Sequence, residues 1–166
     1  MATDSVVHQL AIRVGNKLRD GRLMLATAES CTGGMVAAAI TDISGSSGWF
    51  ERGFVTYSNL AKSEMIGVPA ELIEKHGAVS EPVARAMAEG ALRNSRAQVS
   101  LSITGVAGPG GGTPEKPVGM VSFGWSNRLH TSVETLAFKG DREQIRAQAA
   151  AHALRGLLAL LDEKER

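Results

Sequence analysis

The sequence is poor in residues on which several protein classes depend. Its single cysteine, Cys31, excludes an internal disulfide framework and a multi-cysteine metal site. Four Phe, two Trp and one Tyr are too few for the stacking platforms that bind single-stranded nucleic acid. The net charge of +1 argues against a protein held on nucleic acid by a basic excess, so we expect no nucleic-acid partner.

Long apolar stretches are also missing. The strongest two, Met35–Ile40 and Leu157–Leu161, fall far short of the ~20 residues that span a bilayer. Residues Met1–Gln9 lack the basic and apolar regions of an export signal. We therefore expect a cytoplasmic protein with no membrane partner.

The hydrophobic residues recur at spacings typical of helices and strands. Hydrophobic residues make up 43% of the sequence, and the length predicts one domain over residues 1–166. Predicted helices cover about 4–19, 35–41, 59–66, 69–76, 80–94 and 140–161, and predicted strands cover about 23–27, 54–57, 99–103, 118–125 and 129–138. The alternation predicts a three-layer α/β/α sandwich with a mixed sheet of about five strands, the last two forming an antiparallel hairpin.

Small polar residues follow the first predicted strand, where ligands sit in open α/β sheets. Ser30 and Thr32 offer hydroxyls beside the adjacent glycines Gly33 and Gly34. Two glycines at a helix start let N–H groups approach an anion closely, so one interpretation is a nucleophile next to an oxyanion or phosphate site. The other is a serine or threonine helix cap. The thiol of Cys31 is an alternative nucleophile.

The second strand is followed by a possible partner for that nucleophile. Tyr57 is the only tyrosine, and Lys62 lies on the short helix after it. A buried lysine loses its proton readily, and a neutral lysine can act as the base for a serine; Ser30 is the candidate. The alternatives are a solvated helix lysine and a tyrosine that covers the core.

The loop after the third strand is rich in glycine. Its segment Thr104–Gly112 superficially resembles a dinucleotide fingerprint, but it leads toward a strand rather than a helix. We expect a loop that encloses substrate, with Thr104 and Gly105 facing the site. No P-loop pattern is present, and the four histidines show no ligand-like spacing, so we expect no metal site.

The last predicted helix begins with a capping box and two arginines. Asp141 and Gln144 have capping-box spacing. Arg142 and Arg146 are one turn apart and share a helix face, which suits a phosphate clamp. The alternative is a solvated surface pair.

Six ordered segments resemble the C-terminal domain family of the competence/damage-inducible protein CinA, over residues of about 7–161. They are Ala28–Gly34, Thr56–Lys62, Gly77–Ser80, Thr104–Pro109, Lys116–Gly119 and Gly140–Arg146. The resemblance implies an α/β/α fold and hydrolysis of the carboxamide of nicotinamide mononucleotide without a cofactor.

The same resemblance implies roles for individual residues. Ser30 matches the family's nucleophile, Lys62 its base and Tyr57 a polar partner. Thr104 and Gly105 match the substrate loop, and Arg142 and Arg146 match the basic helix start. Main-chain N–H groups around Thr32, Gly33 and Gly34 are the expected oxyanion donors.

Two other functions remain open from the sequence. One is a non-catalytic module that senses pyridine nucleotides, since the same loops and arginines would serve it. The other is an interaction domain for a competence-related partner. The family also implies a homodimer, for which the sequence indicates no interface.

Overall fold

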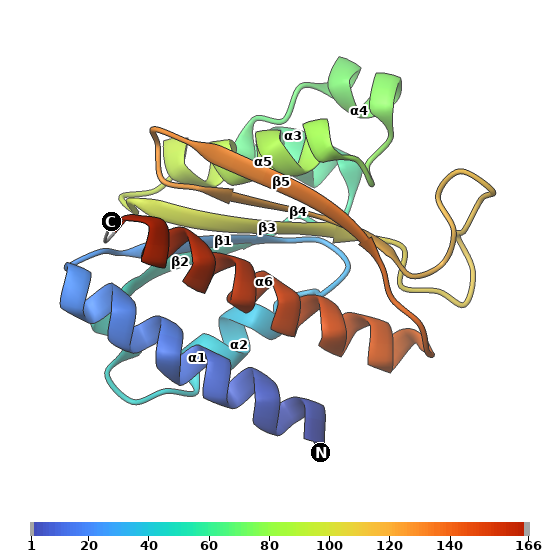
Figure 1. The fold of residues 1–166 in the computed structure, drawn as a ribbon. Coiled ribbons are helices and arrows are strands. Elements are labelled where there is room, and N and C mark those ends of the chain that lie inside the picture. Colours follow the sequence, from blue (N-terminus) through green and yellow to red (C-terminus); the bar gives the residue numbers. More distant parts are fainter. Residues whose placement is uncertain (1, 165–166) are drawn as a thin grey trace.

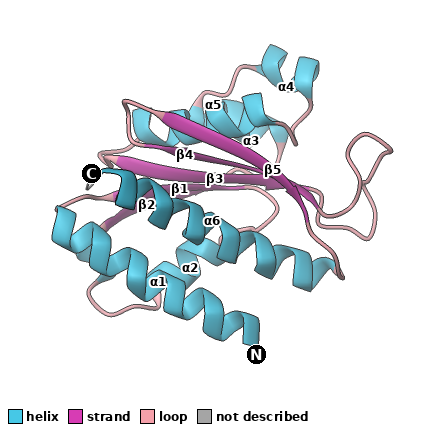
Figure 2. Ribbon diagram, viewed as in Figure 1, coloured by secondary structure: helices cyan, strands magenta, loops and turns pink. Residues whose placement is uncertain are grey.

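The computed structural model describes residues 2–164, which form one mixed five-stranded sheet and six α-helices (Figures 1 and 2). The strands are β1 (Leu25–Glu29), β2 (Phe50–Val55), β3 (Val99–Gly105), β4 (Met120–Ser126) and β5 (Thr131–Ala137). The helices are α1 (Ala2–Gly21), α2 (Met35–Thr41), α3 (Asn59–Ile66), α4 (Ala70–His76), α5 (Glu81–Arg93) and α6 (Arg142–Lys164). The strand order is β2-β1-β3-β4-β5.

Helices cover both faces of the sheet, which confirms the predicted α/β fold. Helices α1, α2 and α6 lie on one face, and α3, α4 and α5 lie on the other (Figure 1). Strands β1, β2 and β3 are parallel, whereas β4 and β5 run antiparallel to their neighbours as the predicted hairpin. Within the described residues, no helix is long and apolar enough to cross a membrane.

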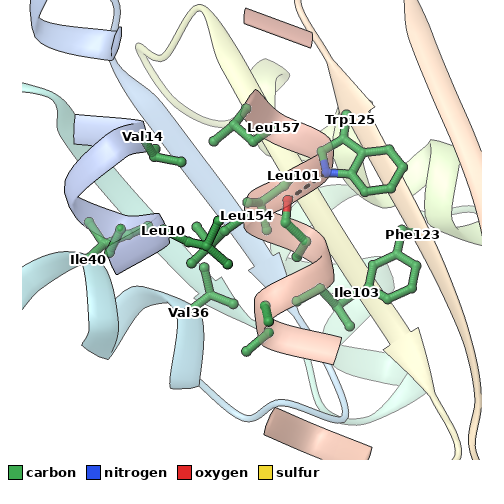
Figure 3. Packing of buried hydrophobic residues seen from close by; sticks show 14 of the residues in the cluster. Leu10, Val14, Val36, Ile40, Leu101, Ile103, Phe123, Trp125, Leu154 and Leu157 are labelled. Atoms are coloured by element: carbon green, nitrogen blue, oxygen red, sulfur yellow. Dashed lines mark hydrogen bonds between the residues drawn. The ribbon is translucent and has the colours of Figure 1, made fainter. Parts of the chain in front are cut away.

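The larger part of the core lies between the sheet and the face covered by α1, α2 and α6. Leu101, Ile103 and Phe123 of the sheet pack there against Leu154 and other residues of α6 (Figure 3). The indole N–H of Trp125 donates to the carbonyl of Ala153 at 2.9 Å, which satisfies its polar atom within the apolar layer. A second buried cluster, around Met87, fills the space under α5.

Helix starts agree with the capping residues in the sequence. The Ser58 hydroxyl accepts from the N–H of Ala61 at 3.0 Å at the start of α3. Asp141 and Gln144 form the reciprocal capping box of α6, with N–H to side-chain oxygen distances of 2.9 and 2.8 Å.

Every strand differs from the predicted one by one to four residues at one end or both, and the first two strands are discussed here. Strand β1 begins at Leu25 rather than near residue 23. Strand β2 covers Phe50–Val55 rather than 54–57, because it is an edge strand with several solvent-exposed positions. Such a strand does not need the continuous apolar run that marks a buried one.

The topology brings three loops to one edge of the sheet. Since β1, β2 and β3 are parallel, their carboxyl ends coincide, with Glu29 in register with both Val55 and Ile103. The chain leaves β1 toward β2 on one side and leaves β3 toward β4 on the other. Ligands in open α/β sheets bind at such a switch point, outside the carboxyl ends of the strands.

Candidate active site

A cavity of about 240 Å³ opens at the carboxyl ends of the parallel strands. The loops after β1, β2 and β3, the segment before α5 and the first turn of α6 all contribute to it. Its wall consists of Ser30, Cys31, Tyr57, Asn59, Lys62, Ala78, Val79, Thr104, Gly105, Ala107 and Arg142. The cavity therefore collects six of the ten residues that the sequence predicts for a site.

Ser30 and Lys62 contact each other in the wall of this cavity. The Lys62 ammonium nitrogen lies 3.1 Å from the Ser30 hydroxyl oxygen, although the two residues are 32 positions apart. Both also contact the main-chain carbonyl of Tyr57, Ser30 Oγ at 3.3 Å and Lys62 Nζ at 3.4 Å. A nucleophile and a base within hydrogen-bond reach of each other are the geometric requirement for nucleophilic catalysis.

Burial prepares Lys62 to act as a base. The side chain is only 1% exposed, so it is not the solvated helix lysine considered above. Removal from water lowers the pKa of Lys62, because burial penalises the charged form. Its hydrogen-bond partners are a hydroxyl and a carbonyl, neither of which carries a charge that would hold the proton.

Cys31 is a poor competitor for the role of nucleophile. Its side chain is buried, and this burial raises the pKa of the thiol to about 11. The thiolate is the reactive form of cysteine, and at neutral pH this thiol stays protonated.

The turn that carries Ser30 is held from one side by Glu29. This carboxyl group, at the end of β1, accepts the Thr32 hydroxyl at 2.6 Å and the N–H groups of Val36 and Ala37 at 3.0 Å each. Glu29 therefore caps α2 in place of the serine or threonine that was the alternative above; the helix begins after Gly34, whose φ of +106° favours glycine.

Arg146 holds the same turn from the other side. Its guanidinium donates to the carbonyls of Cys31 at 3.0 Å and Thr32 at 3.2 Å. The side chain does not line the cavity. The structure thus places the Arg146 side chain against the main chain next to Ser30. Arg142 and Arg146 therefore do not point together into the cavity as the pair of phosphate ligands that helical spacing suggested.

Arg142 is the arginine that reaches the cavity. It lies at the start of α6, is exposed, and donates to the carbonyl of Gly108 in the glycine-rich loop at 2.8 Å. One guanidinium nitrogen is thereby tied to the loop, and the remaining N–H groups have donor capacity for an anion at the cavity mouth.

The other predicted residues fall into two groups. Thr104 and Gly105 line the cavity; the Thr104 hydroxyl donates to the carbonyl of Ala78 at 2.9 Å. A Cβ at Gly105 would lie 2.7 Å from the side chain of Val121, so no larger residue fits there. In contrast, Thr32, Gly33 and Gly34 do not line the cavity, and the Gly33 N–H already donates to the Ser30 carbonyl at 3.0 Å.

Tyr57 contributes both its main chain and its side chain to the site. Its main-chain carbonyl contacts the Ser30–Lys62 pair, while its side chain is 62% exposed at the cavity wall. The phenol therefore does not cover the core, which was the alternative considered above.

Sequence reasoning gave no role to several residues around the cavity. Asn59, at the first position of α3, lines it, as do Ala78 and Val79. Lys116 ties the far end of the glycine-rich loop to this segment by donating to the carbonyls of His76, at 3.0 Å, and Val79. Lys116 is the only lysine in the glycine-rich loop, and that positive charge was the one feature of the sequence that could have indicated its role. Within residues 2–164, no cluster of His, Cys, Asp and Glu side chains has the arrangement of a metal site.

Replacing Glu29 with glutamine is expected to destabilise the protein. The side-chain amide nitrogen of the glutamine would face one of the three groups that now donate to the Glu29 carboxylate. That buried donor would lose its acceptor. Loss of a cap costs about 0.5–2 kcal/mol, and each kcal/mol shifts the Tm of a domain this size by roughly 2–4 °C. Thermal unfolding measures the shift, with the exposed Glu74→Gln on α4 as the control. An unchanged Tm for Glu29→Gln would mean that Glu29 does not hold the turn.

Comparison with known proteins places the chain among relatives of two lengths. The model of the CinA C-terminal domain matches residues 7–161. The chain is 54% identical over 156 residues to a nicotinamide-nucleotide amidohydrolase PncC of Escherichia coli K12, covering 93% of this chain and 94% of that protein. It is also 54% identical over 162 residues to a competence-damage inducible protein of Symbiobacterium thermophilum, of whose length it spans only 38%.

A solved structure agrees with the fold. The crystal structure of a competence/damage inducible protein from Agrobacterium tumefaciens matches with a TM-score of 0.91 and 44% identity. The match covers 93% of this chain and 95% of that one.

Proposed function

Since this chain belongs to the CinA C-terminal domain family, we propose that it is a nicotinamide-nucleotide amidohydrolase with Ser30 as the nucleophile and Lys62 as the base. The observation that carries this proposal is the 3.1 Å contact between the Ser30 hydroxyl and the buried Lys62 amine at the carboxyl ends of the strands. Relatives of the same length that bear this activity in their name add the substrate class.

The first half of the reaction forms an ester with the enzyme. The neutral Lys62 amine takes the proton from the Ser30 hydroxyl, and the Ser30 oxygen forms a bond to the carboxamide carbon. The resulting tetrahedral intermediate collapses as the carbon–nitrogen bond breaks. Ammonia leaves with the proton that Lys62 acquired, which returns Lys62 to its neutral form.

The second half releases the acid. A water molecule gives its proton to Lys62 and its oxygen attacks the ester carbon. The bond to Ser30 breaks, and the Ser30 oxygen regains its proton from Lys62. The sum of the two halves is one amide and one water converted to one carboxylic acid and one ammonia.

Negative charge that develops on the carboxamide oxygen requires N–H donors at the cavity wall. Thr32, Gly33 and Gly34 lie outside that wall. We assign the role to the main-chain N–H groups of Cys31 and Ala107, two wall residues whose N–H groups have no acceptor on another residue in the described part of the chain.

The size of the cavity fits one end of the substrate. At about 240 Å³ it is smaller than the ~300–1,000 Å³ of pockets that enclose drug-sized ligands. It suits the pyridine carboxamide, and the ribose and phosphate then extend to the mouth. Arg142 stands at that mouth and can bind the phosphate by charge-assisted hydrogen bonds.

Alanine substitutions of Arg142 and Arg146 are expected to have different effects. Arg142→Ala should lower kcat/KM for nicotinamide mononucleotide by about 10- to 100-fold and barely change it for nicotinamide riboside, which lacks the phosphate. Arg146→Ala should lower kcat for both compounds by up to about 100-fold, because the turn carrying Ser30 loses its support.

Steady-state kinetics on both compounds make this comparison, with Arg155→Ala, an exposed arginine farther along α6, as the matched control. A wild-type ratio between the two compounds in Arg142→Ala would place the phosphate elsewhere. A selective loss of the mononucleotide in Arg146→Ala would make Arg146 a phosphate ligand.

The alternative is a module that binds pyridine nucleotides without hydrolysis. The Ser30–Lys62 contact favours catalysis, because binding alone gives no reason to bury a lysine against a hydroxyl at a cost in solvation. Conversion of nicotinamide mononucleotide to the acid and ammonia by the purified protein decides between them, since a binding module returns the mononucleotide intact.

A further inference from the structure

Side chains hold every main-chain carbonyl of the segment that joins α4 to α5. Four consecutive carbonyls each accept a hydrogen bond from a side chain, and they belong to His76, Gly77, Ala78 and Val79. The Ser80 hydroxyl donates to the second of these carbonyls at 2.8 Å, and the Thr104 hydroxyl donates to the third at 2.9 Å. Lys116 alone donates to the first, at 3.0 Å, and also to the fourth. We call residues 76–79 the wall segment, because its last two residues line the active-site cavity.

Lys116 reaches the wall segment from the glycine-rich loop between β3 and β4, which projects from the edge of the sheet (Figure 1). Every residue from 109 to 118 is exposed except Lys116, which is half-buried. Thr113 and Lys116 close a turn, in which the Lys116 N–H donates to the Thr113 hydroxyl at 2.9 Å. Lys116 is therefore the residue through which the outer part of the loop is hydrogen-bonded to the wall segment.

The end of a helix accounts for only one of the two contacts of Lys116. His76 is the last residue of α4, and the last carbonyls of a helix lack partners within it and favour a nearby cation. Val79 lies three residues beyond that end, in the cavity wall. Among residues 2–164, no carboxylate is paired with the Lys116 ammonium. The second contact therefore serves the wall and not the helix.

The wall segment presents two N–H donors that the fold does not use. Within the described part of the chain, the main-chain N–H groups of Ala78 and Val79 have no acceptor. A peptide group is planar, so a carbonyl that is held in place also fixes the N–H of the next residue. Ser80 and Thr104 hold the two peptide groups that carry these donors, and Lys116 holds the peptide groups on either side.

We propose that Lys116 is a positioning residue for amide hydrolysis, which holds the wall segment so that the N–H groups of Ala78 and Val79 bind ribose oxygens of the substrate. This role rests on the proposed function. The carboxamide oxygen is assigned to other N–H groups and the phosphate to Arg142, which leaves the ribose for these donors. Lys116 has no hydrogen bond to Ser30 or Lys62, so this pair should persist without it.

Lys116→Met tests this role, because methionine keeps the stem and removes the amine. Its kcat should fall by about 10- to 100-fold for nicotinamide mononucleotide and nicotinamide riboside alike, since a small misplacement of the substrate is enough for such a loss. The midpoint of the pH profile of kcat should stay at the wild-type value, because the surroundings of Lys62 do not change. Lys75→Met, which removes an exposed amine one residue before the wall segment, is the matched control.

Restoring the amine at the same position should restore the rate. Lys116→Cys should be as slow as Lys116→Met until alkylation with 2-bromoethylamine returns an amine on a side chain of similar length. The native Cys31 is buried, and burial raises the pKa of its thiol to about 11, so the reagent should act at position 116. Wild-type protein treated with the same reagent shows that the treatment itself does not alter the rate.

Hydrogen exchange measures the wall segment without any substrate. Amide exchange in a peptide that covers residues 76–80 should be faster in Lys116→Met than in wild type and unchanged in Lys75→Met, because the segment opens more often. Thermal unfolding establishes that each variant is folded at the temperature of the assay.

Four results would overturn the proposal: an unchanged kcat in Lys116→Met, unchanged exchange, a shifted pH midpoint, or no recovery after alkylation. A loss confined to the mononucleotide would also overturn it, because Lys116 would then be a phosphate ligand. A wild-type protein that releases no ammonia contradicts the proposed function instead, and the exchange measurement still decides whether Lys116 holds the wall segment.

Discussion

Replacing Ser30 with alanine is expected to lower kcat for nicotinamide mononucleotide by about 10⁴-fold or more, since loss of a nucleophile removes the covalent route. The protein should stay folded, because the hydroxyl makes only a 3.3 Å bond to the Tyr57 carbonyl and a 3.1 Å contact with Lys62. Single-turnover and steady-state rates, with binding of the mononucleotide measured separately, distinguish lost chemistry from lost binding.

Cys31→Ala is the matched control for that experiment. The thiol lies next to Ser30 on the same cavity wall, and burial raises its pKa to about 11, so its removal should leave most of the activity. An inactive Cys31→Ala together with an active Ser30→Ala would reverse the assignment of the nucleophile.

Lys62→Met is expected to lower kcat by about 10²–10⁴-fold, the usual contribution of a general base. Methionine keeps the apolar stem and removes the amine. In the wild type, kcat should rise with pH as Lys62 loses its proton and should level off above a midpoint lower than the ordinary 10.5, because burial lowers this pKa. A variant with unchanged kcat and a raised KM would make Lys62 a binding residue.

Stability gives an independent check on the same lysine. Since its pKa is lowered on folding, the unfolded chain binds more protons than the folded one, and Lys62 costs stability below its folded pKa. That cost declines as pH rises toward 10.5. The Tm of Lys62→Met relative to wild type should therefore be highest near pH 7 and fall toward pH 10, with the exposed Lys75→Met as the control. A difference that does not change with pH would mean that Lys62 stays charged in the fold.

Local signals in the sequence predicted much of this architecture. The start of α6 follows from the Asp141 and Gln144 side chains, which satisfy its first N–H groups and are only three residues apart. The positions of the strand ends in the sequence predicted where the active-site cavity would lie, because the carboxyl ends of parallel strands meet at one edge of a sheet. Residue chemistry named Ser30 as the candidate partner of Lys62, and the family resemblance favoured that pairing over the alternatives, since a contact that spans 32 positions has no local signal in the sequence.

What sequence could not supply was the direction of individual side chains. Helical spacing puts Arg142 and Arg146 on one face, yet one reaches the cavity and the other turns under the main chain at Cys31. Two glycines before α2 favoured donors at Thr32–Gly34, but Glu29 occupies that helix start. Both outcomes depend on how α6 and β1 pack against the turn, and a local pattern does not contain that information.

The most direct test of the proposed amidase is product analysis with nicotinamide mononucleotide as the sole substrate. Purified protein is incubated with it in EDTA, and ammonia and nicotinate mononucleotide are quantified over time, with Ser30→Ala in parallel. The account predicts the two products in equal amounts from the wild-type protein and neither from Ser30→Ala. Binding of the mononucleotide with no ammonia released, or equal release by Ser30→Ala, would contradict it.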